Sequence, residues 1–135
     1  MEAIERHITD YSVEEFVVGH FGAFDRMAAS QLQLAKKKHP EIILTLLIPY
    51  HPGERAIMLP EGFDRSFYPL GMEAVPRQVA IVRANHYMVQ NSDYLICYNK
   101  GYVGNTRNLL SIARHRERDG LIHIENLAYI HESDG

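Results

Sequence analysis

Glycine, amide, hydroxyl and guanidinium groups are concentrated in the segment "NKGYVGNTR", which runs from residue 99 to residue 107 and contains no carboxylate. The residues that carry them are Gly101, Gly104, Asn105, Thr106 and Arg107. Glycines allow a ligand to approach the backbone, the polar side chains suit the N-cap of a helix, and the arginine is a fixed cation at a helix N-terminus. These groups together suit a phosphate. An ordinary glycine turn before a capped helix has the same residues, so both interpretations stay open.

A second glycine-containing segment, "GHFGAFD", spans residues 19 to 25 and has the opposite charge. Asp25 at the start of a helix repels a phosphate held there, but a carboxylate at such a corner accepts hydrogen bonds from ribose hydroxyls. Gly19 and Gly22 would let a sugar or base come close to the backbone. The alternative is that Asp25 only caps its helix.

A third candidate loop runs from Pro49 to Arg55. Arg55 follows the Pro52-Gly53 turn signal, and its long side chain would reach across the rim of a sheet toward a phosphate. His51 is a weaker candidate of the same kind. The alternative is a solvated arginine on a long loop.

Alternating helices and strands must position these loops. The expected strands are residues 15–18, 42–49, 93–98 and 121–124, and the expected helices are residues 2–10, the stretch from Phe24 to His39, residues 76–91, and the stretch from Leu109 to Gly120. Residues 50 to 75 are expected to be irregular. This order predicts an α/β fold, a Rossmann-like three-layer sandwich with a mostly parallel sheet. In such a sheet all three loops leave the same rim, where ligands bind.

The length and composition set limits on the function. A chain of 135 residues fits a single domain, residues 1–135, and its net charge of −3 argues against a general affinity for nucleic acid or anionic membranes. The N-terminus lacks the apolar core of a signal peptide, and no apolar run reaches the roughly 18 residues of a membrane span, so a cytoplasmic protein is expected. Cys97 lies in an apolar strand and is expected to be inert. No histidine spacing indicates a metal site.

Several longer stretches together resemble one known family, the SLOG superfamily, in its small bacterial branch. They are "GHFGAFDRMA", "LLIPYHPGER", "LPEGFDRSFYP", "RANHYMVQNSDYLICY" and "GYVGNTRNLL", in this order between about Val13 and Leu127. The superfamily includes the cytokinin-activating phosphoribohydrolases and the bacterial DNA-processing protein A. The resemblance implies a Rossmann-like sheet, glycine loops that bind nucleotides or nucleotide-derived ligands, and a homodimer. Its first motif falls on Gly19, Gly22, Phe24 and Asp25, and its second on Gly101, Gly104, Asn105, Thr106 and Arg107.

Two departures from the family pattern matter. The phosphoribohydrolases carry a catalytic glutamate three residues after the threonine of their glycine motif, whereas Thr106 leads here to Leu109. Relatives also begin with a strand that ends in a Gly-His-Arg-like segment, and this sequence starts at the helix after it. We therefore expect no hydrolysis by the family route and a sheet that lacks its first, central strand.

The leading interpretation is a cytoplasmic protein that binds a nucleotide-like small molecule, with phosphate at residues 101–107, ribose at Asp25, and no cofactor or metal. Whether it catalyses a reaction is left open. One alternative is a nucleotide N-glycosidase that uses Asp25 or Glu73 with Arg55. Another is a module associated with single-stranded DNA or with a protein partner, which the negative charge of the chain disfavours.

Overall fold

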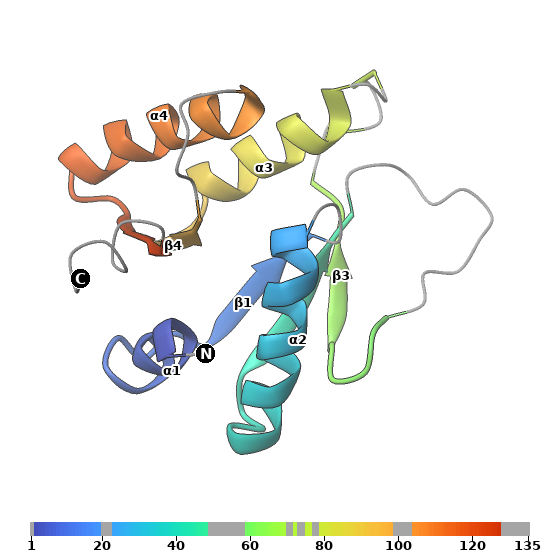
Figure 1. Ribbon diagram of the computed structural model, residues 1–135. Coiled ribbons are helices and arrows are strands. Elements are labelled where there is room, and N and C mark those ends of the chain that lie inside the picture. Colours follow the sequence, from blue (N-terminus) through green and yellow to red (C-terminus); the bar gives the residue numbers. More distant parts are fainter. Residues whose placement is uncertain are drawn as a thin grey trace. The chain divides into compact units, whose positions relative to one another are not determined.

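The computed structural model describes residues 2–19, 23–48, 59–69, 72, 75–76, 79–98 and 104–127, with only the backbone at residues 23 and 104–108. The chain forms two compact units, Met1–Ala80 and Ile81–Gly135. Both contain helices and parallel strands that alternate along the chain, except that β3 follows β2 with no helix between them among the described residues. The mixed order confirms the α/β class and is compatible with a Rossmann-like layout (Figure 1). The expectation that residues 1–135 make one domain concerns how the units combine, and it stays a prediction.

The first unit contains a three-stranded sheet. Its elements are α1 (Glu2–Thr9), β1 (Glu15–Val18), α2 (Ala23–Lys38), β2 (Ile43–Leu47) and β3 (Arg65–Phe67). The strand order is β1-β2-β3, and both pairs are parallel. The observed β1 has the bounds that the sequence predicts, and α2 ends directly before His39 and Pro40, as expected.

The core of this unit lies around β2. Leu44, Leu46 and Leu47 are buried, so successive residues of this strand are covered on both faces, as the apolar run predicts. The helix α2 packs against β1 (Figure 1). Its residues Leu32 and Ala35 are also buried. This packing fixes the position of the first turn of α2 at the carboxyl end of β1.

The second unit contains α3 (Ala80–Gln90), β4 (Tyr94–Cys97), α4 (Gly104–Arg118) and β5 (His123–Asn126). The two strands pair in parallel, with Tyr94 opposite His123. The hydrophobic core of the unit consists of Val89, Ala113 and Ile122, packed by Leu95, Leu109, Ile112 and Ile124. After α4, Gly120 adopts a φ of 73°, a conformation that favours glycine and ends the helix as predicted.

Four elements differ clearly from the sequence expectation. The helix α4 begins at Gly104, five residues before the expected start at Leu109. The stretch 50–75, expected to be irregular, contains β3, which at three residues is too short to show an alternating pattern. The third helix begins at Ala80 rather than at Pro76, because a separate turn, in which the Val79 N–H donates to the Pro76 carbonyl, precedes it. The last strand is His123–Asn126, two residues later than expected.

Candidate functional site

The corner between β1 and α2 brings two of the expected residues together. Gly19 follows the last residue of β1, and Asp25 is the third residue of α2. A Cβ atom added to Gly19 would lie 2.9 Å from Oδ2 of Asp25 and 3.7 Å from its Cγ. The carboxylate therefore turns back from the helix and lies directly over the glycine.

This contact shows what a side chain at position 19 would meet, which is the carboxylate at the end of the Asp25 side chain. The sequence suggested that a sugar or base would approach the backbone here, and the structure shows the chain's own carboxylate in close approach. Asp25 and the neighbouring Phe24 are both half-buried. The corner thus places a carboxylate, a group that accepts hydrogen bonds from hydroxyl donors, at the carboxyl end of a parallel strand.

The corner between β4 and α4 has a different chemical character. The helix α4 begins at Gly104 and has no acidic residue in its first turn, whereas α2 has Asp25 in that position. The first N–H groups of an α-helix have no partner within the helix and carry a partial positive charge. This first turn is therefore suited to an anion and that of α2 is not.

The expected role of Asn105 and Thr106 as N-cap residues is wrong. Both lie inside the first turn of α4, after its first residue Gly104, and not before it. A residue that caps a helix must precede the first helical residue, so neither can cap α4. The backbone of residues 104–107 is described, and the side chains of Asn105, Thr106 and Arg107 lie outside the described part.

Three other expected site residues, Gly22, Arg55 and Gly101, lie outside the described residues, as do His51 and Glu73, which were weaker candidates. The structure therefore brings together Gly19 and Asp25 with Phe24 beside them. It describes Gly104 as the start of α4.

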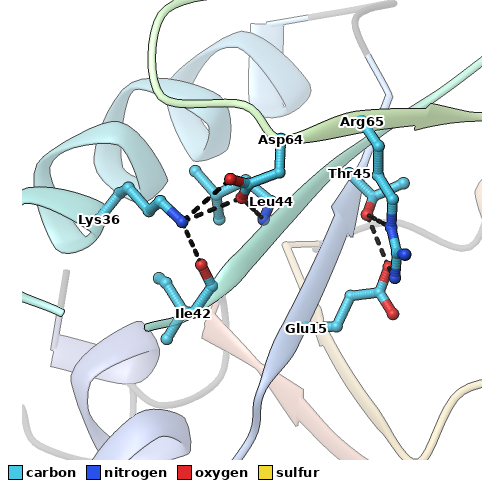
Figure 2. Close-up of polar contacts among 7 residues, drawn as sticks. All are labelled: Glu15, Lys36, Ile42, Leu44, Thr45, Asp64 and Arg65. Carbon is cyan, nitrogen blue, oxygen red and sulfur yellow. Dashed lines mark hydrogen bonds and ion pairs between the residues drawn. The ribbon is translucent and has the colours of Figure 1, made fainter. Parts of the chain in front are cut away.

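The sequence did not single out the polar contacts that hold β3. Asp64, directly before β3, accepts hydrogen bonds from the Leu44 backbone N–H at 2.8 Å and from the Lys36 ammonium at 3.0 and 3.2 Å (Figure 2). The same ammonium donates to the carbonyl of Ile42. The hydrogen bond from Leu44 and the contact with Lys36 lower the pKa of Asp64.

A second polar contact crosses all three strands of the sheet (Figure 2). The hydroxyl of Thr45 donates to Glu15 at 2.6 Å and accepts from Nε of Arg65 at 3.4 Å, while Arg65 also donates to Glu15 at 2.9 Å. Burial alone would raise the pKa of Glu15, but the hydrogen bonds from Thr45 and Arg65, together with the charge of Arg65, lower it.

These contacts stabilise the sheet and do not belong to the candidate site. Glu15 is the first residue of β1 and Gly19 follows its last, so the Glu15 contacts lie at the amino end of the strand. The sequence offered one weak signal for them, since Thr45 is the only polar residue in the apolar run of residues 42–49. A hydroxyl buried to 1% exposure needs hydrogen-bond partners, which here come from β1 and β3.

Other candidate chemistry is limited. Burial raises the pKa of the Cys97 thiol to about 11, against the charge of Arg114, so the thiol is protonated and inert at neutral pH, as expected. Within the described ranges no group of three or more His, Cys, Asp or Glu residues is placed to hold a metal ion. No helix in that part of the chain is long and apolar enough to cross a membrane.

Comparison with protein-family models and with curated proteins found no match to this chain. The resemblance to the SLOG superfamily therefore depends on the sequence stretches quoted above.

Proposed function

We propose that this protein binds a nucleotide or nucleotide-derived ligand at the carboxyl end of its parallel strands, with the ribose at the corner formed by Gly19 and Asp25. The observation that carries the proposal is the carboxylate of Asp25 above Gly19. In α/β folds with parallel sheets, ligands bind outside the carboxyl ends of the strands. A carboxylate there recognises hydroxyl groups in preference to phosphate.

The ribose is the part of a nucleotide that fits this corner best. Its two neighbouring hydroxyls are donors, and an ionised carboxylate is an acceptor with two oxygens. A phosphate would meet the negative charge of Asp25, so the phosphate needs a different element. The first turn of α4, which has no acidic residue, is proposed separately as an anion-binding element, with Arg107 as its cation.

The family, the location and the assembly are part of the same proposal. The sequence stretches that resemble the SLOG superfamily, in the same order along the chain, support a bacterial, cytoplasmic protein that forms a homodimer. Native mass spectrometry of protein purified without denaturation tests the ligand and the assembly together. A retained mass that matches a nucleotide and a dimeric species are the expected results.

The ribose proposal is tested by binding of ribonucleoside 5′-monophosphates and their 2′,3′-dideoxy analogues, measured by calorimetry. If Asp25 accepts the ribose hydroxyls, the wild-type protein prefers a ribonucleotide to its dideoxy analogue by about ten-fold or more, since a hydrogen bond to a charged group is worth about 1.5 to 3 kcal/mol. The variant Asp25→Asn removes most of that preference.

The matched control is Asp119→Asn, which removes an exposed carboxylate after the end of α4 and should bind like the wild type. Equal affinity for the ribonucleotides and their dideoxy analogues in the wild-type protein would refute the role of Asp25. Binding of none of the ribonucleoside monophosphates or their dideoxy analogues, together with no retained nucleotide in native mass spectrometry, would refute nucleotide binding.

A further inference from the structure

The helix α2 has apolar side chains on two sides. Leu32 and Ala35 on one side are buried, whereas Met27 and Leu34 on the other side are 54% and 48% exposed. Met27 and Leu34 are seven residues apart, which is almost two turns of a helix, so they lie on the same side of α2, about 10.5 Å apart along its axis. Single exposed apolar residues are common on protein surfaces, but two that are aligned along one helix indicate a contact surface.

The exposed side of α2 has the residue spacing of a helix–helix contact. Met27, Ser30, Gln31 and Leu34, which we call the outer face of α2, are the four residues that would surround a side chain inserted from a second helix. Ser30 is small, and its hydroxyl donates to the carbonyl of Arg26 at 3.1 Å. A side chain that packs over Ser30 therefore buries no unsatisfied hydroxyl.

The charges beside the outer face are all positive. Arg26, Lys37 and Lys38, which we call the basic border, are exposed. In the described part of the chain none of the three forms an ion pair with a carboxylate. Asp25 is the only acidic residue of α2, and it is two residues from Met27, about 200° around the helix axis. The carboxylate of α2 therefore belongs to the opposite side and does not neutralise the basic border.

These charges decide between the possible occupants of the outer face. A second copy of α2 would bring its own basic border against the first, and like charges in close contact are unfavourable. An anionic membrane fits poorly, because the whole chain has a net charge of −3 and lipid offers no side chain to fill the space over Ser30. A helix with an apolar stripe between acidic residues matches both the spacing and the charge.

We propose that the outer face of α2 is a docking surface for an acidic amphipathic helix of a partner protein. The apolar side chains of the partner pack between Met27 and Leu34, and its carboxylates face the basic border. Docking of this kind goes beyond the proposed nucleotide site and does not depend on it, because Asp25 lies on the opposite side of α2.

The test uses two displayed libraries of helical peptides, selected for binding to the whole protein. The peptides have the 16-residue length of α2, and the residues of their apolar stripe are varied. One library has glutamate fixed at the positions beside the stripe, and the other has lysine there. Peptides should be enriched from the acidic library and not from the basic one, and their affinity should fall as the salt concentration rises.

Variants of α2 locate the binding surface. In the double variant Met27→Ser, Leu34→Ser the tightest acidic peptide should bind about ten-fold or more weakly, since both apolar contacts are lost. In the double variant Lys37→Gln, Lys38→Gln it should bind about three- to ten-fold more weakly and depend less on salt. Both are measured by fluorescence anisotropy.

The matched controls lie in the other unit. Leu121→Ser removes a leucine that is 52% exposed, and Arg118→Glu changes an exposed arginine of α4, so both variants should bind the peptide like the wild type. Nucleotide binding should be unchanged in all four variants, so a failure of the docking proposal leaves the proposed ligand site untouched.

Several results would overturn the docking proposal. They are enrichment of no peptide from the acidic library, equal enrichment from the basic library, and unchanged peptide affinity in Met27→Ser, Leu34→Ser. Binding of the wild type to phosphatidylglycerol vesicles that is lost in this double variant would assign the outer face to a membrane instead. Loss of a dimer in the same variant would assign it to a second copy of the chain.

Discussion

Substitution of Gly19 by alanine separates the role of the Asp25 carboxylate from the stability of the fold. The new Cβ would lie 2.9 Å from Oδ2 of Asp25, and ordinary contacts begin at about 3.4 Å, so the carboxylate must move by at least about half an ångström. Oδ2 is the end of a flexible side chain, and among the described residues that do not adjoin Gly19 in the chain, no backbone atom lies within 4 Å of the new group. We therefore expect the free energy of unfolding to change by less than about 1 kcal/mol.

Ligand affinity should respond more strongly than stability. A hydroxyl acceptor displaced by half an ångström loses much of its hydrogen bond, so Gly19→Ala should weaken a ribonucleotide by about ten-fold. Affinity is measured by calorimetry and stability by urea unfolding. In an Asp25→Ala background, where the clash is absent, Gly19→Ala should have no further effect on affinity.

Two results would refute this reasoning. If Gly19→Ala costs several kcal/mol of stability, the glycine is required by the backbone and not by the carboxylate. If Gly19→Ala weakens the ligand equally in the wild-type and Asp25→Ala backgrounds, the added methyl group acts on the ligand directly, and Asp25 has no part in the effect.

Three further predictions concern the rest of the molecule. Arg107→Ala should weaken a phosphorylated ligand by roughly 1.5 to 3 kcal/mol, and an unchanged affinity with an intact fold would remove this residue from the site. Because folding lowers the pKa of Asp64 and Glu15, the two carboxylates stabilise the fold fully above the ordinary carboxyl pKa range, and this stabilisation should be lost as the pH falls below about 4. Urea unfolding at several pH values measures the loss. In Asp64→Asn the free energy of unfolding should fall less steeply over the same pH range. Leu44→Ala should cost about 2 to 5 kcal/mol, whereas Leu34→Ala, at a position that is 48% exposed, should stay within about 0.5 kcal/mol by the same unfolding assay.

The sequence predicted the elements that are determined by residues close together in the chain. Residues 15–18 are a short apolar strand next to glycine, and the apolar run around Leu44, rich in branched residues, favours a covered strand, so both were predictable. The strand β3 was not, because Arg65 and Ser66 are exposed and the strand is defined by pairing with β2 rather than by a hydrophobic pattern. Tertiary pairing of this kind has no signal in a short window.

The candidate site was predictable to a similar degree. A glycine after a strand and an acid early in the next helix suggested that Gly19 and Asp25 share a corner, and the structure brings them into contact. The close approach of the carboxylate to the glycine depends on a side-chain rotamer, which the sequence does not specify. The pairing of His39 with Glu5 could not be predicted either, since it joins two helices through their packing.

The bridge formed by Glu15, Thr45 and Arg65 has a consequence for how the chain can vary. Shifting β3 by one residue would turn Arg65 to the opposite face and bring Ser66 next to Thr45, and the bridge would be lost. Polar side chains therefore act together with the backbone pairing to determine the alignment of this strand. Substitutions at Glu15, Thr45 or Arg65 are consequently expected to loosen the alignment of β3 on β2 even where the apolar core is unchanged.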